Sequence, residues 1–218
     1  GSAGPAFLEF VAVGANLFFV CNALDGHELW RSDGTATGTV QVRDLMVGPA
    51  SSFPTGLLVS GSRVFFQAAT SGNGTEPYVS DGTAAGTTLL ADVVAGPNGS
   101  FPTAFTTLGS VVLFGANQSL WRTDGTPAGT FQVASPGPGL MVAAGALAWF
   151  TAGGALWTTD GTAGNANHVA GLSAGMFGTI PSLTVFGTSV LAQVNRGQGA
   201  PNELWIAAPT LAPQLLYQ

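Results

Sequence analysis

Short runs of Val, Leu, Phe and Thr alternate along the chain with clusters of Gly, Pro, Asn and Asp. Such runs are typical of β-strands, and such clusters are typical of turns. The first stretch predicts strands over residues 7–13, 16–21, 27–32 and 40–45, and the next repeats the plan over 56–60, 63–68, 76–80 and 88–93. A last strand is expected over 214–217. Because no helical period is sustained, the pattern predicts an all-β protein.

One segment recurs at similar points of this plan. Residues 28–39 read Glu-Leu-Trp-Arg-Ser-Asp-Gly-Thr-Ala-Thr-Gly-Thr, and residues 76–87 and 119–130 are close copies. Residues 155–164 lose the second Gly-Thr, and residues 203–205 keep only the opening. The aromatic position recurs at intervals of 48, 43, 36 and 48 residues, three of which suit a propeller blade, while the short one implies a trimmed loop. Its five occupants are Trp30, Tyr78, Trp121, Trp157 and Trp205.

Five four-stranded copies fit the chain, from a first strand at its beginning to a fourth strand at its end. A ring of such copies hides sheet edges that an open row exposes. We therefore predict one domain over 1–218, a five-bladed β-propeller of four-stranded antiparallel blades, at about 7–50, 51–99, 100–139, 140–178 and 179–218. The alternative is an open β-solenoid, or a fragment of a longer array.

The recurring run Glu-Leu-Trp-x-x-Asp-Gly-Thr resembles the signature of bacterial ELWxxDGT-repeat proteins, and the strand order is similar to kelch and quinoprotein-type propeller blades. The resemblance implies a propeller-like fold and a secreted or cell-surface location. It implies no common activity. The chain departs from the signature where Pro77 and Tyr78 replace Leu-Trp, where Ser119 replaces Glu, and in the shortened last two copies.

Charge narrows the classes of partner. Hydrophobic residues make up 46% of the chain and charged residues 7%, with no lysine and a formal net charge of −6. Nucleic-acid and anionic-membrane binding depend on Lys and Arg, so neither is expected. The uncharged segment 140–157 holds several glycines and aligns with strand–turn–strand segments, so no membrane insertion is expected. No signal peptide is visible, and Gly1–Ser2 is consistent with a leader having been removed.

For the repeated polar and aromatic positions we expect structural roles, and functional roles are the alternatives. Asp33, Asp81, Asp124 and Asp160 are expected to accept backbone hydrogen bonds within their turns. The rival is a Ca²⁺ site, although each turn offers one carboxylate and Ca²⁺ takes about six to eight oxygens. The repeated aromatics are expected to pack between blades, with sugar stacking as the rival. Solvation, or bonding to a turn, is the default role of Glu28, Glu76 and Glu203.

Few residues remain for catalysis or a cofactor. No His or Cys spacing typical of a metal site occurs, and no nucleotide-binding fingerprint appears, so no cofactor is predicted. Cys21 lies in an apolar run and is expected to be a small buried hydrophobe. Glu9 and Asp25 are the only carboxylates outside the repeat pattern. We therefore predict a protein that is not an enzyme, with a propeller hydrolase as the less favoured alternative.

Variable loops on a rigid scaffold usually carry recognition. In an antiparallel blade the loop between the second and third strands and the segment that crosses to the next blade leave at one end, and the Asp-Gly-Thr turns leave at the other. The candidate ligand-binding residues at the first end are Asp25, His27, Phe53, Asn73, Phe101, Asn117, Asn195 and Arg196. A competing interpretation places Phe53 and Phe101 as plugs between blades. The predicted function is a lectin-like module that binds a glycan or a surface protein. The alternative is an assembly unit of a larger surface protein, and whether the chain is a monomer or self-associates is left open.

Overall fold

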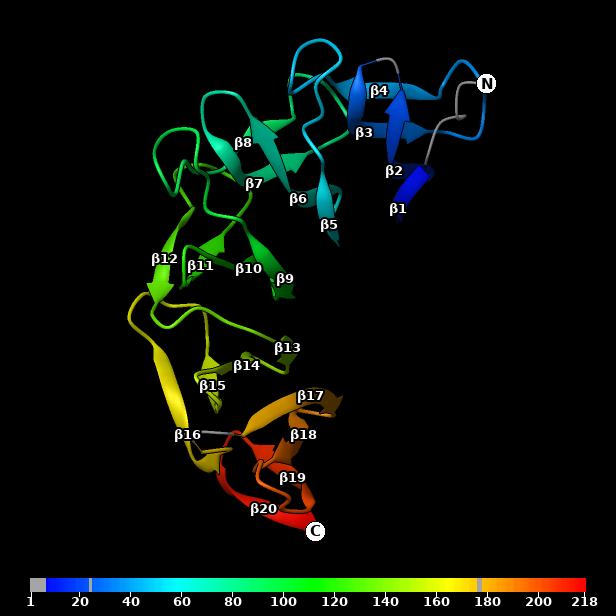
Figure 1. Cartoon of the computed structure of the whole chain (residues 1–218). Coiled ribbons are helices and arrows are strands. Elements are labelled where there is room, and N and C mark those ends of the chain that lie inside the picture. Colours follow the sequence, from blue (N-terminus) through cyan, green and yellow to red (C-terminus); the bar gives the residue numbers. More distant parts are fainter. Residues whose placement is uncertain (1–6, 24, 176–177) are drawn as a thin grey trace. The chain divides into compact units, whose positions relative to one another are not determined.

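The computed structural model describes residues 7–23, 25–175 and 178–218. Every regular element in this part of the chain is a β-strand (Figure 1). The strands form five sheets of four, each an antiparallel meander of consecutive strands. The predicted fold class, a β-propeller of five four-stranded antiparallel blades, is confirmed.

The first two blades follow the expected plan closely. Blade 1 consists of β1 (Phe7–Val13), β2 (Asn16–Ala23), β3 (Gly26–Ser32) and β4 (Val40–Arg43). Blade 2 consists of β5 (Thr55–Ser60), β6 (Arg63–Thr70), β7 (Gly74–Ser80) and β8 (Thr88–Leu89). The turn between β5 and β6 begins at Gly61, whose φ of 61° lies in the left-handed region that a tight hairpin turn requires.

The remaining blades repeat this plan. Blade 3 consists of β9 (Thr103–Leu108), β10 (Val111–Ala116), β11 (Ser119–Thr123) and β12 (Phe131–Ala134). Blade 4 consists of β13 (Met141–Ala144), β14 (Leu147–Ala152), β15 (Ala155–Thr159) and β16 (Ala166–Ser173). Blade 5 consists of β17 (Thr179–Phe186), β18 (Ser189–Asn195), β19 (Asn202–Ala208) and β20 (Leu211–Tyr217).

The chain divides into two compact units, residues 1–105 with 123–130, and residues 106–122 with 131–218. In the first unit, Phe18 and Leu29 of blade 1 pack against Val64, Phe66 and Tyr78 of blade 2. In the second unit, one core lies between blades 3 and 4 and another between blades 4 and 5. Full burial of each such side chain stabilises the fold by about 1.5–3 kcal/mol.

The fourth strands of blades 1 and 2 are shorter than predicted. The sequence predicts strands over 40–45 and 88–93, whereas β4 ends at Arg43 and β8 at Leu89. The backbone N–H groups of Leu45, Val93 and Val94 donate to glutamate side chains instead of to a neighbouring strand. A buried carboxylate therefore ends the strand pairing in both blades.

Candidate ligand-binding face

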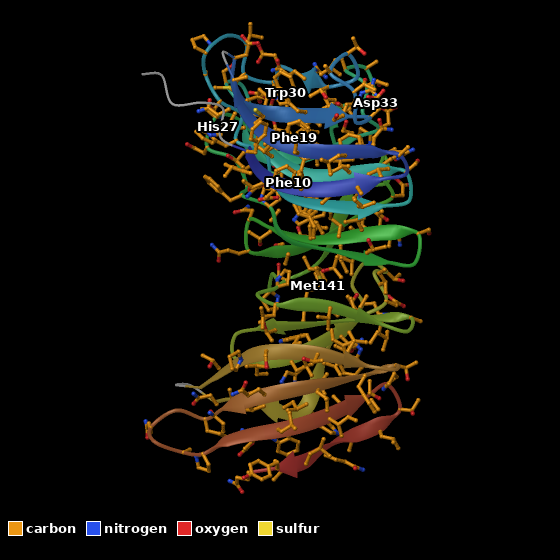
Figure 2. The ribbon with its side chains drawn as sticks, turned by 90° about the vertical axis from the view of Figure 1, so that its right-hand side faces the viewer. Phe10, Phe19, His27, Trp30, Asp33 and Met141 are labelled. Atoms are coloured by element: carbon orange, nitrogen blue, oxygen red, sulfur yellow. The ribbon has the colours of Figure 1, made fainter. Side chains whose placement is uncertain are left out.

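The two ends of a blade carry different parts of the repeat. In blade 1, β3 runs from the loop before His27 to the turn that contains Asp33, and Figure 2 shows the two labelled residues at opposite ends of the strands. The crossing segment lies at the His27 end, because the Phe53 N–H donates to the His27 carbonyl at 3.2 Å. Loop and crossing segment thus share one end, which we call the crossing face.

A buried glutamate organises this face in blade 1. Glu28 is fully buried. Its carboxylate accepts hydrogen bonds from the Ser52 N–H at 2.9 Å, the Ser52 hydroxyl at 2.5 Å and the Leu45 N–H at 3.3 Å. Glu28 therefore clamps both ends of the crossing segment to β3, and the solvated role considered for it is wrong.

Blade 2 repeats the same clamp. The fully buried Glu76 accepts hydrogen bonds from the Val93 and Val94 N–H groups at 3.2 and 3.1 Å and from the Ser100 hydroxyl at 2.5 Å. Burial raises the pKa of the Glu28 and Glu76 carboxyls, and the hydrogen bonds that they accept oppose part of this rise. A buried carboxyl with this many donors holds its surroundings rigidly.

Each clamp presents an exposed phenylalanine. Phe53 and Phe101 follow the clamped serines directly, and 59% and 64% of their surfaces are exposed. Their φ angles are 48° and 51°, in the left-handed region that a side chain disfavours by about 1–2 kcal/mol. The prolines that follow, Pro54 and Pro102, are buried. The interpretation of both phenylalanines as plugs between blades is wrong, because their rings face solvent.

His27 joins Phe53 in one small aromatic group. The two rings stack with centroids 5.0 Å apart and planes at 24°. The Ser51 hydroxyl accepts a hydrogen bond from the His27 N–H at 2.9 Å and lies 3.4 Å from Nδ1. His27 is half-buried, so the stack holds one face of the Phe53 ring and leaves much of that ring open.

The other predicted binding residues differ in how free they are. Asp25 and Asn117 are exposed. The Asn73 side chain donates to Asp92 at 2.9 Å, and the Asn195 side chain accepts from the Gly197 N–H at 2.7 Å.

Arg196 is bound by residues of blades 4 and 5. Its guanidinium donates to Glu203 at 3.0 and 2.8 Å and to the Ser173 carbonyl at 2.5 Å. The Trp205 indole also donates to Glu203, at 2.6 Å. Hydrogen bonds from Arg196 are the main reason that the pKa of Glu203 is lowered, and Glu203 is nearly buried rather than solvated. The Arg196 charge is therefore already neutralised within blade 5.

The Asp-Gly-Thr turns form the opposite end of blades 1 to 4. In blade 2 the Asp81 carboxylate accepts from the Thr83 N–H at 2.8 Å and the Thr83 hydroxyl at 2.7 Å. These bonds lower the pKa of Asp81, and the bond from the Thr83 hydroxyl contributes most. A Cβ at Gly86 would overlap this carboxylate, so the second glycine of the motif is required by contact. The carboxylates of Asp33, Asp124 and Asp160 bond to their turns in the same way.

Three of the repeated aromatics lie on faces between blades. Tyr78, Trp157 and Trp205 belong to or pack against the core clusters, and Phe114 stacks on Trp121 with centroids 6.4 Å apart. Cys21 is buried, and burial raises the pKa of its thiol. Within the described residues no cluster of three or more His, Cys, Asp or Glu side chains is placed to hold a metal ion, and no helix is long and apolar enough to cross a membrane.

Sequence reasoning missed the serines of the two clamps. Ser52 and Ser100 each lie 24 residues after the glutamate that they bind. The signal was available, because Ser-Phe-Pro occurs at residues 52–54 and again at 100–102. A tripeptide that recurs in step with the repeat indicates a shared role for all three residues.

Solved structures share this fold at low sequence identity. A puromycin hydrolase matches with a TM-score of 0.63 and 16% identity, over 100% of this chain and 38% of its own. A prolyl endopeptidase matches with a TM-score of 0.61 and 10% identity, over 98% of this chain and 36% of its own. An ancestral GH74 enzyme matches with a TM-score of 0.60 and 8% identity, over 98% and 31%. This chain thus spans about a third of their length. No family model and no curated protein matches it.

Proposed function

We propose that the chain is a non-catalytic binding module that recognises a neutral carbohydrate through the crossing face of blades 1 and 2. The observation that carries this proposal is the pair of exposed phenylalanines, Phe53 and Phe101, each held in a disfavoured backbone conformation by a buried clamp. Strained residues of this kind concentrate at ligand-binding and catalytic sites. Two such residues at equivalent repeat positions point to a shared ligand contact.

The chemistry of the face favours a sugar. The apolar C–H face of a pyranose packs against an open aromatic ring, and the rings of Phe53 and Phe101 are open to solvent. Asp25 is exposed at the same end of blade 1, where its carboxylate can accept hydrogen bonds from sugar hydroxyls. A few polar groups beside an apolar platform are the usual composition of a small-molecule site.

The absence of catalysis is part of the proposal. The carboxyls of Glu28 and Glu76 are engaged in the clamps, each with hydrogen-bond donors from the crossing segment. Glu9, outside the repeat pattern, accepts the Gly56 and Leu57 N–H groups at 3.2 and 2.9 Å. Glycoside hydrolysis usually needs two carboxyl groups facing each other across the scissile bond. The likeness to hydrolases rests on fold alone, and in our proposal this chain supplies a propeller without their chemistry.

The ELWxxDGT-like motif supports a further part of the proposal, a secreted or cell-surface location on a bacterium. An assembly role is the second candidate, because one edge strand of blade 1 and one edge strand of blade 5 carry exposed apolar side chains. These are Phe7, Leu8 and Phe10 on β1 and Leu215, Leu216 and Tyr217 on β20. Light scattering separates the two roles, since concentration-dependent oligomers without a glycan ligand favour assembly.

A glycan array probed with the whole chain tests the carbohydrate proposal. For a glycan that binds, calorimetry with Phe53→Ala and Phe101→Ala is expected to show a loss of affinity on the order of tenfold for each ring, or about 1.4 kcal/mol. The matched control is Phe186→Ala, which removes a ring that is 67% exposed at the opposite end of blade 5. An array without binders, or an equal loss in the control, refutes the proposal.

A further inference from the structure

The Asp-Gly-Thr turns of blades 2, 3 and 4 each cover a side chain of the preceding blade. A Cβ built on the glycine would approach the covered side chain to 2.8 Å in blade 2 and 3.3 Å in blade 3, and would lie 3.5 Å away in blade 4. The three pairs are Gly82 over Phe18, Gly125 over Phe65 and Gly161 over Leu113. We call the position that each turn glycine occupies over the preceding blade a seat. In the seats of Gly82 and Gly125, little room remains for any side chain larger than that of glycine.

An arginine of the preceding blade completes the seat in two cases. Arg63 Nη1 donates to the Gly125 carbonyl at 3.0 Å, and Arg122 Nη1 donates to the Gly161 carbonyl at 3.3 Å. These two seats therefore offer an apolar surface for the glycine methylene and a donor for its carbonyl. What they receive is the backbone of a peptide turn.

Blade 5 lacks the turn that would fill the next seat. Only Pro209 and Thr210 join β19 to β20. Trp149 pairs with Thr158 across β14 and β15, as Phe18 pairs with Arg31 in blade 1, so Trp149 occupies the covered position of blade 4. A cavity of about 290 Å³ lies there. Its walls include Leu147, Trp149 and Thr158 of blade 4 and Ala208, Leu211 and Pro213 of blade 5.

The walls of this cavity match a neutral ligand with a hydrogen-bond acceptor. Trp149 is only 1% exposed, and its indole N–H has no partner among the described residues. A buried donor without a partner is costly, and an acceptor placed beside it removes that cost. Thr158 stands where blade 3 has Arg122, and no Asp, Glu, Lys or Arg lines the cavity. The remaining walls are Leu, Val, Ala and Pro together with the His168 ring, and the apolar majority favours an apolar body over a hydroxyl-rich one.

We propose that the cavity between blades 4 and 5 binds a glycine-containing turn of another polypeptide, with a turn carbonyl accepting from the Trp149 indole. The three equivalent seats of this chain indicate which ligand would bind, because each already holds an Asp-Gly-Thr turn. In the seat on blade 4, the donor is the Trp149 indole where two other seats have an arginine, and blade 5 has no turn to fill this seat. This site is separate from the carbohydrate site on the crossing face, so an experiment can refute either proposal without refuting the other.

The test is a titration of the whole chain, ¹⁵N-labelled at tryptophan, with the peptide Ser-Asp-Gly-Thr-Ala-Ala-Gly-Thr, the sequence of residues 80–87. We expect the Trp149 indole resonance, assigned with Trp149→Phe, to shift saturably with a Kd on the order of 1 mM, as suits so small a pocket. A peptide with alanine at the first glycine is the control, and we expect it to bind at least roughly tenfold more weakly. The indoles of Trp30 and Trp121, also without partners, should not move.

Two variants of the chain complete the test. Replacing Pro209 and Thr210 by Asp-Gly-Thr-Ala-Ala-Gly-Thr fills the seat from within, and peptide binding should disappear. Trp149→Phe keeps a ring and removes the donor, so calorimetry should show binding weakened by roughly tenfold. The proposal is overturned by an unshifted Trp149 resonance, by equal binding of the alanine peptide, or by a larger shift with N-acetylglucosamine than with the peptide. Unchanged binding to Trp149→Phe overturns the role of the indole.

Discussion

Removal of the Glu76 carboxylate should destabilise the protein far more than removal of an exposed glutamate. In Glu76→Ala, the Val93 and Val94 N–H groups and the Ser100 hydroxyl lose their acceptor. Each buried donor left without a partner costs about 1–3 kcal/mol. The cavity allows some relaxation and some water to enter, so we expect a loss of about 3–5 kcal/mol in the free energy of unfolding. Glu76→Gln keeps one acceptor oxygen and should lose about 1–2 kcal/mol.

The chain offers a matched control in Glu9→Ala. The Glu9 carboxylate also accepts two backbone N–H groups, from Gly56 and Leu57, but it is exposed. Water replaces the lost acceptor there, so the expected cost is below about 1 kcal/mol. The two substitutions remove the same side chain and comparable bonds, and they differ in burial.

Urea unfolding followed by tryptophan fluorescence measures these losses, and hydrogen exchange at Val93 and Val94 locates them. Because the chain contains two compact units, each transition should be fitted separately. Protection of the Val93 and Val94 amides should fall in Glu76→Ala and persist in Glu9→Ala. Equal losses in the two variants, or a loss below about 1 kcal/mol in Glu76→Ala, would show that the clamp does not hold the crossing segment.

Four further outcomes follow from the same structure. Burial raises the folded-state pKa of Glu76 above its ordinary 4.5, so protonation of this carboxyl favours the fold. Relative to Glu76→Gln, the stabilisation of the wild type by this proton should be complete below pH 4.5 and should be lost as pH rises through the raised folded-state pKa. Denaturation midpoints measured across that range test this expectation. Asp81 has a lowered pKa, so its contribution is present above its ordinary 3.8 and is lost as pH falls through the lowered value; Asp81→Asn should abolish that acid-side loss. Phe101→Gly relieves about 1–2 kcal/mol of backbone strain and adds about 0.5–1 kcal/mol of unfolded-state entropy, so calorimetric stability should be unchanged or slightly higher, whereas a clear loss would mean that the ring packs. Gly86→Ala forces a Cβ into the Asp81 carboxylate and should cost about 1–3 kcal/mol, while Gly72→Ala, with nothing within 4 Å, should stay within about 0.5 kcal/mol; equal melting shifts would contradict the contact.

The sequence by itself determined the strands and their grouping into blades. Alternation of apolar runs with Gly, Pro and Asn clusters is a local property, and the hairpin register follows from short turns such as the one at Gly61. The predicted range 7–13 matches β1, and 63–68 falls within β6. The motif repeat then indicated the number of blades, because each copy begins at the third strand of one blade. The sequence was therefore sufficient to predict the fold class.

Only the tertiary structure decided which polar residues are buried and which aromatics are free. Glu28 and Glu76 look like surface residues in the sequence, and they become buried because the crossing segment, 24 residues later, folds over them with its own donors. The sequence left Phe53 and Phe101 open between ligand contacts and plugs between blades, and the same clamp turns their rings outward. The cavity beside Trp149 arises because blade 5 lacks the Asp-Gly-Thr turn that covers the equivalent position in earlier blades. Burial and openness depend on which segments meet, and a local pattern records only what each segment is able to form.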